Sequence, residues 1–209
     1  MIYEFLKRAT DVLIAFLGMI ILSPVIILTA LAIKLDSKGP VFADTPERVG
    51  RNGQLFKMYK FRSMVMGAHD LLQKNPHLLE QYKKNSYKIK DDPRVTNVGK
   101  FIRRFSIDEF PQLLNILKGE MSVVGPRAYY PFELEEQQIK YPNSREFVKI
   151  ILSAKPGATG VWQVSGRSDI NFDKRVEMDA QYVQRRSALY DIYLILKTFP
   201  AVLIGRGAV

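Results

Sequence analysis

The sequence has no cysteine and only two histidines among its 209 residues, and these absences remove whole classes of chemistry. Without cysteine there is no disulfide, no thiolate metal site and no thiol nucleophile. His69 and His77 lie eight residues apart in a polar stretch, an arrangement that does not predict a zinc site built from histidines.

Several familiar nucleotide-binding motifs are missing as well. The chain has no GxxxxGK[ST] loop and no GxGxxG after a strand, which are the commonest phosphate-binding loops. It also lacks a GxSxG elbow. There is no Asp-x-Asp, which argues against a metal-dependent glycosyltransferase of the nucleotide-binding type. Most of the common classes of soluble nucleotide-binding enzyme are therefore excluded.

Charge is absent from one long stretch near the N-terminus. The 22 residues from Val12 to Ile33 carry no charged side chain, which is long enough for a helix to span a bilayer. Ser23 and Pro24 lie at the centre of this run, where a proline removes a backbone donor and clashes with the preceding turn. We expect Pro24 to free the carbonyl of Ile20, and the Ser23 hydroxyl to bind it.

Two structures fit this broken run: a kinked transmembrane helix, or a re-entrant helix that turns at Ser-Pro. Lys7 and Arg8 precede the run, and four more basic residues follow it between positions 34 and 51. The positive-inside rule would hold both ends in the cytoplasm. This favours a re-entrant membrane helix over residues 1–36, followed by a cytoplasmic domain over residues 37–209. No small-residue cleavage site follows the run, so a signal peptide is not predicted.

The positive charge of the chain is concentrated in its middle. The net charge is +10, and residues 48–104 alone contain 14 Lys/Arg against 4 Asp/Glu. Such a block requires an anionic partner or forms a solvated basic surface. Beside a membrane segment, lipid headgroups or phosphorylated substrates are favoured over nucleic acid.

The remaining sequence predicts a mainly α fold with a small β-hairpin. Turn residues at 50–53 between two short alternating runs predict the hairpin, and residues 71–92 predict a helix followed by a polar loop, with Pro76 as a break. Further helices are expected at 98–105, 109–117, 131–140, 144–153, 172–186 and 188–204. The last of these is apolar over most of its circumference, which fits either a core helix or a helix in the membrane interface.

Two adjacent carboxylates, Asp108 and Glu109, stand at the start of one predicted helix. The pattern Ser106-x-x-Glu109 fits a capping box, so a purely structural role is open. Pro111 instead favours Asp108 as the N-cap, because the proline then falls in the first turn, where amides are unpaired anyway. In that register the Asp108 carboxylate lies at the positive end of the helix, where ionisation is favoured.

An ionised carboxylate is a poor base but a usable nucleophile or magnesium ligand. Arg103 lies five residues before Asp108 and is placed to bind a phosphate through its bidentate fork. Lys60 and Arg62 of the KFRSM stretch fit the same role, or else a surface role facing lipid headgroups.

Two further arginines lie in turn-rich segments. Arg127 ends the turn GPR, and Arg167 lies in PGATGVWQVSGRSD, residues 156–169, which also holds the only tryptophan, Trp162. Arg167 is a further candidate for binding substrate. For Trp162 the simplest interpretation is a buried aromatic residue in a structural loop.

At these residues the chain resembles the bacterial sugar transferases, the monotopic phosphoglycosyl transferases. The resemblance runs nearly end to end, through the apolar run with Ser-Pro and the motifs GPVF, FKMYKFRSM, DDPRVTNVGKFIRR, SIDEFPQLLNILKGEMSVVGPR and PGATGVWQVSGRSD. It implies a re-entrant helix on a small helical domain with interfacial helices, at the cytoplasmic face of the bacterial inner membrane.

The resemblance also implies a reaction. A UDP-sugar, with a hexose such as galactose or glucose, would donate its sugar 1-phosphate to undecaprenyl phosphate and release UMP, as the first membrane step of exopolysaccharide, O-antigen or glycoconjugate synthesis. By motif, Asp108 would be the nucleophile that forms a phosphosugar intermediate and would lie at or near a Mg²⁺ ion. Glu109 would assist in proton handling or metal binding. Lys60, Arg103 and Arg127 would hold phosphates.

Several points stay open at this stage. The segment Gly67–Lys90 looks longer than in the smallest family members, and its role is undefined. Similar transferases often carry extra N-terminal membrane helices, so the chain is either a naturally short form or a catalytic fragment. The identity of the sugar and the presence of a homodimer are not determined. One alternative is a non-catalytic basic scaffold at the membrane surface. Another is direct attack by the polyprenyl phosphate, with Asp108 only as a metal ligand.

Overall fold

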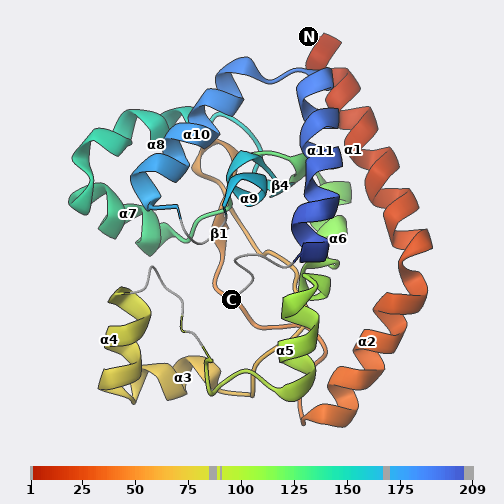
Figure 1. The fold of residues 1–209 in the computed structure, drawn as a ribbon, viewed down its shortest axis with the longest axis vertical. Helices are drawn as coiled ribbons and strands as arrows, with labels where there is room; N and C mark the ends of the chain where they lie inside the picture. Colours follow the sequence, from red (N-terminus) through yellow and green to blue (C-terminus); the bar gives the residue numbers. More distant parts are fainter. Residues whose placement is uncertain (1, 85–88, 90, 167–169, 205–209) are drawn as a thin grey trace.

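The computed structural model describes residues 2–84, 89, 91–166 and 170–204. Its first two helices, α1 (Ile2–Ile21) and α2 (Ser23–Asp36), run along one edge of the molecule, with the other elements on one side of them (Figure 1). Among the described helices, none alone is long and apolar enough to cross a membrane. The pair α1 and α2, bent by 61°, has the length and composition of a broken span or a re-entrant loop.

The bend between α1 and α2 has the local chemistry that the sequence predicts. The Ser23 hydroxyl donates a hydrogen bond of 2.7 Å to the carbonyl of Ile20, and Pro24 lies in the first turn of α2. The expected rescue of that carbonyl is therefore confirmed. Large apolar side chains are exposed along both helices, among them Phe16, Ile21 and Leu28.

The predicted hairpin is confirmed. Strands β1 (Arg48–Val49) and β2 (Leu55–Phe56) pair antiparallel across the short 3₁₀ turn η1 (Arg51–Gly53). The turn contains Asn52 at φ 56° and Gly53 at φ 79°, both left-handed conformations that these two residue types tolerate better than most.

The stretch after the hairpin forms two helices where one was expected. These are α3 (Ala68–Gln73) and α4 (Pro76–Lys84). Pro76 opens the second helix, where its missing N–H removes no helical hydrogen bond. The segment Gly67–Lys90 thus contains two short helices in the part that the structure describes.

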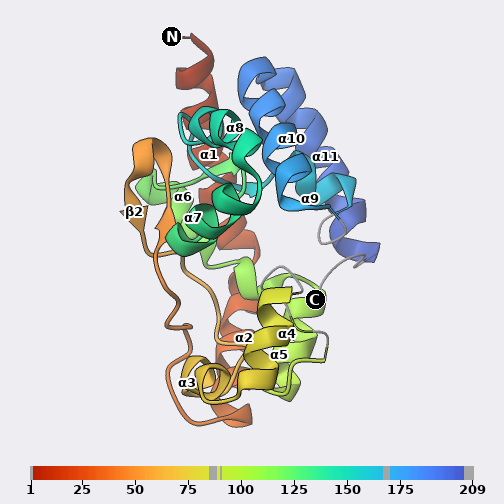
Figure 2. The ribbon, with the colours of Figure 1, turned by 90° about the vertical axis from the view of Figure 1, so that its left-hand side faces the viewer.

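Most of the later helices match their predicted ranges to within a few residues. They are α5 (Asn97–Arg104), α7 (Pro131–Lys140), α8 (Arg145–Ile151), α10 (Phe172–Arg185) and α11 (Ala188–Ile204), with a 3₁₀ turn η3 (Pro142–Ser144) before α8. One short helix, α9 (Val161–Ser165), lies in a stretch that was expected to be a loop. α10 packs beside α8 and α9 (Figure 2).

The predicted start of the helix after the two carboxylates is wrong. α6 runs over Gln112–Lys118 with Pro111 at its N-cap, and a separate 3₁₀ turn, η2 (Ile107–Glu109), precedes it. Ser106, at φ 55°, turns the chain sharply between α5 and η2. Neither Ser106 nor Asp108 caps α6, because this turn and the proline separate them from the helix.

A second pair of strands joins segments far apart in the sequence. β3 (Ser122–Val124) and β4 (Gly157–Thr159) pair in parallel, with Ser122 opposite Gly157. Their backbones approach so closely that a Cβ on Gly157 would lie 2.0 Å from the nitrogen of Gly125. Only glycine fits there. This pairing, which the sequence did not predict, brings the GPR turn beside the PGATG loop.

The apolar core consists of several clusters that link the elements. One contains Tyr129 and Val176 and joins α8 with α10, and another contains Ile33, Phe61 and Ile102 and joins α2 with α5. A third places Ala15 of α1, which is fully buried, against Ile116 of α6. The first helix is therefore part of the core on one face and exposes apolar side chains on the other.

Candidate active site

The carboxylate of Asp108 lies near the middle of the molecule, in η2 between α5 and α6. The residue is only 8% exposed. Its carbonyl accepts a hydrogen bond of 2.9 Å from the backbone N–H of Phe61. This bond holds the segment that contains Lys60 beside the two carboxylates.

Lys60 contacts both acidic side chains. Its Nζ lies 2.6 Å from Oε1 of Glu109 and 3.9 Å from Oδ2 of Asp108. Burial lowers the pKa of Lys60, but Glu109 and Asp108 outweigh that effect and raise it overall. Lys60 therefore stays protonated beside the pair. We refer to Asp108, Glu109 and Lys60 as the carboxylate centre.

A buried asparagine fixes the position of Lys60. Asn115 of α6 is fully buried and accepts a hydrogen bond of 2.9 Å from the backbone N–H of Tyr59. Its amide donates to the carbonyl of Lys57 at 2.8 Å and to Glu120 at 2.7 Å. The chain before Lys60 is thereby tied to the helix that follows the carboxylates, so the centre is held from both sides.

The electrostatics of Asp108 differ from the prediction. Burial raises the pKa of this carboxyl to about 6, opposed by Lys60 and Arg103 and assisted by the like charge of Glu109. Ionisation was expected to be favoured by a helix end, but Asp108 does not cap α6. At neutral pH the group is mostly ionised, and its raised pKa makes it a better nucleophile than an ordinary aspartate.

Arg62 has a different environment from the one expected for a phosphate ligand. Its guanidinium donates five hydrogen bonds around the C-terminal end of α2, to the carbonyls of Ile33, Ser37, Lys38 and Pro40 and to the Ser37 hydroxyl. An arginine has five N–H donors, so none remains for a phosphate. Arg62 therefore links the C-terminal end of α2 to the segment that contains Lys60.

Arg127 lies on the far side of the centre, in the turn after β3. Its backbone N–H donates to Oδ2 of Asp179 at 2.9 Å, and its guanidinium lies 4.8 Å from the ring centroid of Trp162. Burial lowers the pKa of Arg127, but Glu133, followed by Tyr129 and Tyr130 and with a smaller contribution from Glu109, outweighs it and raises the pKa. Arg127 thus connects the carboxylate centre with a second group of charged residues.

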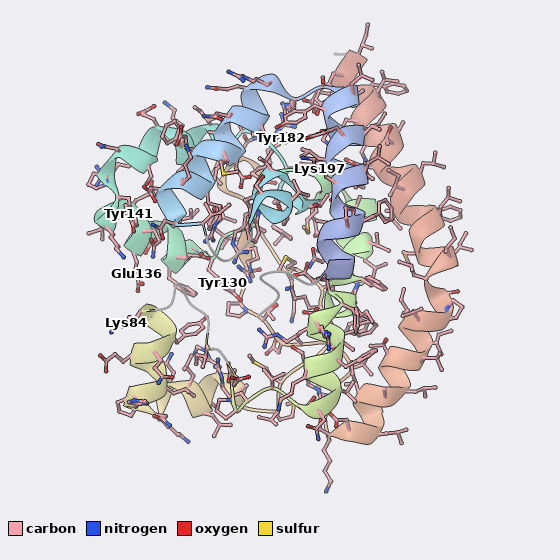
Figure 3. The ribbon with its side chains drawn as sticks, in the orientation of Figure 1. Lys84, Tyr130, Glu136, Tyr141, Tyr182 and Lys197 are labelled. Atoms are coloured by element: carbon pink, nitrogen blue, oxygen red, sulfur yellow. The ribbon has the colours of Figure 1, made fainter. Side chains whose placement is uncertain are left out.

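That second group surrounds the tryptophan. Arg175 of α10 places its guanidinium 5.1 Å from the Trp162 centroid, and Arg48 of β1 lies 3.2 Å from the centroid of Tyr130. Figure 3 labels Tyr130, which immediately precedes α7. We call the group the arginine–tryptophan cluster. Its members are Arg48, Arg127, Tyr129, Trp162, Gln163, Arg175 and Asp179.

This cluster holds an unusual number of unpaired polar atoms. In the described ranges, seven buried side-chain polar atoms lack a hydrogen-bond partner, and five of them belong to residues that contacts link around Arg127: Arg127, Tyr129, Trp162, Arg175 and Asp179. They include Nε of Arg127 and Arg175, Nε1 of Trp162, the Tyr129 hydroxyl and Oδ1 of Asp179. Buried polar groups are normally satisfied, so such a concentration indicates a place for a polar ligand or for water.

Asp179 is the acidic member of this cluster. It is fully buried, and burial raises the pKa of its carboxyl to about 7 even though the Arg127 N–H and the Arg175 and Arg127 charges lower it. At neutral pH its charge is therefore only partly developed. Three arginines then outweigh the acids around them, and the site favours an anion.

The structure brings together some of the predicted site residues but not all. Lys60, Asp108 and Glu109 form one centre, and Arg103 affects the pKa of Asp108 from the last turn of α5. Arg127 belongs to the arginine–tryptophan cluster, and the charge of Glu109 reaches it from the centre. Arg167 lies outside the described residues. Sequence reasoning missed Arg48, Arg175 and Asp179, because nothing in the local pattern indicated that they meet.

The carboxylate centre offers a limited donor set for a metal. The described residues contain no group of three or more His, Cys, Asp and Glu side chains arranged around a metal position. Magnesium, however, commonly takes one or two carboxylates and completes its shell with water and substrate phosphates. Asp108 and Glu109 fit that mode, provided that Glu109 shares its carboxylate between the ion and Lys60.

Comparisons with known proteins bear on this arrangement. A family model described as "Bacterial sugar transferase" matches residues 2–205. The chain is 45% identical over 206 residues to the exopolysaccharide production protein ExoY of Sinorhizobium fredii, which covers 97% of this chain and 87% of the relative.

Two longer relatives carry more specific names. An undecaprenyl-phosphate galactose phosphotransferase of Salmonella typhimurium is 42% identical over 209 residues, covering 98% of this chain and 42% of the relative. A UDP-glucose:undecaprenyl-phosphate glucose-1-phosphate transferase of Escherichia coli is 38% identical over 209 residues, covering 97% and 41%. The chain therefore spans less than half the length of these two relatives.

These matches place the chain in a class of group-transfer enzymes. It belongs to the bacterial sugar transferase family, since the family model covers nearly the whole chain. The resemblance read from the sequence motifs is confirmed, and so is the prediction of an enzyme that transfers a sugar phosphate.

Proposed function

We propose that this protein transfers a hexose 1-phosphate, such as galactose or glucose 1-phosphate, from a UDP-hexose to undecaprenyl phosphate and releases UMP. The observation that carries the proposal is the buried Asp108 carboxylate, which contacts Lys60 and lies next to a cluster of unpaired arginine donors. The names of the Salmonella and Escherichia relatives support this pair of substrates.

In the first step, a carboxylate oxygen of Asp108 attacks the sugar-side phosphorus of the donor. A bond forms between that oxygen and phosphorus, and the bond from phosphorus to the bridging oxygen breaks. UMP leaves with the bridging oxygen and its electron pair. The product on the protein is an acyl phosphate that carries the sugar. A raised pKa favours Asp108 as the nucleophile, because nucleophilicity rises with basicity.

In the second step, a phosphate oxygen of undecaprenyl phosphate attacks the same phosphorus. The bond to Asp108 breaks and returns the carboxylate, and undecaprenyl-diphosphate-hexose is released. Both steps transfer a phosphoryl group and depend mainly on positioning and charge stabilisation. Lys60 and Arg103 lie beside the reacting carboxylate, and Arg127 and Arg175 offer N–H groups to phosphates.

A magnesium ion at Asp108 and Glu109 would supply further neutralisation of the diphosphate charge when bound. The donor set of two adjacent carboxylates supports such a site. Within it, Lys60 holds Glu109 in place at 2.6 Å and keeps a second positive charge near the diphosphate of the donor, from which UMP leaves.

The same proposal includes a membrane position. α1 and α2 would enter the inner membrane from the cytoplasm and return at Ser23, which would place the carboxylate centre at headgroup level, where a cytosolic nucleotide sugar and a lipid phosphate can meet. Support comes from the 61° bend, the satisfied Ile20 carbonyl and the exposed apolar side chains of both helices. The exposed face of α11, with Leu189, Leu196 and Phe199, would lie along the interface.

Trapping the intermediate tests the chemistry. The purified full chain is incubated with UDP-hexose labelled in the sugar and without acceptor, and label that resists denaturation is measured. We expect stoichiometric labelling of the wild type and none of Asp108→Asn, whose UMP release falls by a factor on the order of 10⁴. An unlabelled but fully active wild type would contradict the covalent route and leave direct attack by the lipid phosphate. Unchanged UMP release by the variant would contradict a catalytic role for Asp108.

The absence of cysteine makes the topology directly testable. A single cysteine at Ile2, which is 79% exposed, provides the only thiol in the chain. In intact cells we expect no reaction with an impermeant thiol reagent added outside, and full reaction after permeabilisation. Labelling from outside would show that the helix pair crosses the membrane. An exposed position on α8, Arg145→Cys, serves as the cytoplasmic control.

A further inference from the structure

A cleft that shares no residue with the carboxylate centre lies where α1 meets β3 and the loop before β4. It measures about 90 Å³, and five basic side chains line it: Lys7, Arg8, Arg51, Lys155 and Arg186. Only two carboxylates, Glu4 and Asp11, share the lining. Nothing in the proposed reaction uses these residues.

Some of these charges are already neutralised. Lys7 pairs with Asp191 of α11 at 2.9 Å, and Arg186 pairs with Glu4 at 2.8 Å. Asp11 accepts hydrogen bonds of 2.9 Å from the Ser122 hydroxyl and the backbone N–H of Val123. Three cations, Arg8, Arg51 and Lys155, then remain opposite the single carboxylate of Asp11.

The three remaining cations lie close to one another and to the end of α6. Arg8 donates to the carbonyls of Ile116 and Leu117, at 2.6 Å and 2.8 Å. Both Nζ of Lys155 and Nη2 of Arg8 lie beside Gly119, at 3.3 Å and 3.6 Å from the position of an added Cβ. The carbonyl end of a helix attracts cations, which explains this gathering, but its partial charge does not cancel two full charges.

Two of the cations have no partner of their own. Across the described part of the chain, neither Nζ of Lys155 nor the guanidinium of Arg51 makes an ion pair or a hydrogen bond. Burial lowers the pKa of Lys155, and the Arg8 and Arg51 charges lower it further, while the carboxylates of Asp11 and Glu4 offset this only in part. A bound anion would relieve this repulsion by pairing with several of the cations at once.

The position of the cleft indicates the source of the anion. It opens at the N-terminal end of α1, beside the start of α11, and Tyr182, labelled in Figure 3, lines it from α10. The outer surface of the same two helices exposes Ile2, Phe5 and Leu189, which are 79%, 74% and 80% exposed. The exposed apolar side chains on the outer surface of these helices and the unpaired cations in the cleft on their inner side are the two kinds of group that bind acyl chains and headgroups.

We propose that this cleft binds the phosphate group of an anionic phospholipid headgroup. The lipid would dock Lys155, Arg51 and Arg8 against the membrane surface and fix the angle at which α1 enters it. The inference rests on the membrane position proposed above, but not on the chemistry at Asp108. Because the cleft is separate from the carboxylate centre, its loss changes membrane engagement and leaves the reaction itself intact.

The test compares two charge-matched double variants of the full chain. Arg51→Gln/Lys155→Gln removes the two unpaired cations of the cleft. Arg145→Gln/Lys149→Gln removes two exposed cations of α8, which lies on the side of the molecule away from α1 (Figure 1). Each protein is titrated with nanodiscs that contain zwitterionic lipid and increasing phosphatidylglycerol, and the apparent affinity and unfolding temperature are measured.

We expect the cleft variant to lose affinity for phosphatidylglycerol discs by roughly 25-fold, since each of the two cations near a membrane surface contributes about fivefold. The control variant should lose less than about threefold. Equal losses in both variants would show diffuse surface attraction and overturn the site, as would an unchanged cleft variant. The unfolding temperature in purely zwitterionic discs verifies that both variants fold.

Two further arms separate the other outcomes. If inorganic phosphate alone stabilises the wild type as much as phosphatidylglycerol does, the ligand is soluble and the lipid assignment fails. Turnover with detergent-dispersed substrates at saturation should be unchanged in the cleft variant, in contrast to Asp108→Asn. The two proposals can fail separately. If the wild type shows no transferase activity but still prefers phosphatidylglycerol discs, and loses that preference in the cleft variant, the proposed function is contradicted and the lipid site stands.

Discussion

The carboxylate centre and the arginine–tryptophan cluster are both buried and both charged, but they differ in how their polar groups are paired. In the centre, Lys60 contacts Asp108 and Glu109. The side chains of Asn115 and Arg62, which hold the segments around Lys60, have hydrogen-bond partners. In the cluster, seven residues keep buried polar atoms without a partner among the described residues. The polar groups that support the carboxylate centre thus have partners in the free protein, whereas several buried polar atoms of the cluster do not.

The difference indicates a division of labour. A complete network holds reacting groups in one geometry before substrate arrives, which is what phosphoryl transfer requires. Unpaired donors lower stability in the free protein, and they gain partners when a polar ligand binds. Mutations in the centre and its supports should therefore affect stability and turnover, whereas mutations that remove only an unpaired atom of the cluster should affect donor binding and leave stability nearly unchanged.

The largest effect is expected from Arg62→Met. This change leaves the carbonyls at the end of α2 without their buried donor and loosens the segment that carries Lys60. We expect a loss of about 3 kcal/mol or more in the free energy of unfolding, measured by denaturation in detergent. Lys100→Met on exposed α5 serves as the control. A variant as stable as the wild type would show that the centre does not depend on this tie.

Arg127→Lys tests the cluster side of the comparison. Lysine keeps the charge but loses the planar fork and the unpaired Nε. We expect the KM for the UDP-hexose to rise by about 30- to 100-fold with an unchanged unfolding temperature. A fall in the unfolding temperature with unaltered KM would reverse the assignment of this residue.

Asp179→Asn probes the cluster through pH. The carboxyl pKa is raised from 3.8 to about 7 in the folded protein, so between these values only the folded state holds the proton. Stability from this group is present at low pH and is lost as pH rises through about 7. The wild type should lose about 2 kcal/mol more than the variant between pH 5.5 and pH 8. The exposed Asp173→Asn on the same helix should follow the wild type, and parallel profiles for all three would contradict the raised pKa.

The smallest effect is expected from a matched pair of tyrosines. The Tyr129 hydroxyl has no partner in the described structure, whereas that of Tyr182 donates to Asp191 at 2.6 Å. Tyr129→Phe should leave stability unchanged or slightly higher, and Tyr182→Phe should cost about 1 to 2 kcal/mol. For donor affinity we expect the reverse order, with a loss of a few-fold only in Tyr129→Phe. Equal destabilisation by both changes would contradict the unpaired state of the Tyr129 hydroxyl in the cluster.

The sequence predicted what depends on neighbouring residues. The Ser23–Ile20 hydrogen bond, the hairpin at residues 50–53 and most of the later helices follow from local turn chemistry and periodicity. The start of α6 was predicted too early. The sequence around Ser106 and Asp108 fits a helix cap, but Ser106 is left-handed and a separate 3₁₀ turn follows it, so the helix begins only after Pro111. The adjacent Asp108 and Glu109 were found as two carboxylates at the start of a predicted helix, and only the family resemblance gave them catalytic roles.

Contacts between distant segments could not be predicted in this way. β3 and β4 pair across more than thirty residues of sequence, and their approach depends on glycines whose partner the local pattern does not identify. Arg62 and Arg127 look alike as basic residues in motifs, yet one ends among carbonyls of α2 and the other beside a tryptophan. The cluster itself joins residues of β1, the turn after β3, α9 and α10, so no single stretch reveals it.

The packing of α1 has a practical consequence for protein engineering. Deleting residues 1–36 to obtain a water-soluble enzyme would remove Ala15 from the core against Ile116 and take Asp11 away from Ser122. It would also withdraw Arg8 from the carbonyl end of α6, the helix that carries Asn115. A soluble form is better sought by replacing the outward apolar side chains of α1 and α2 with polar ones, since these do not contribute to the core.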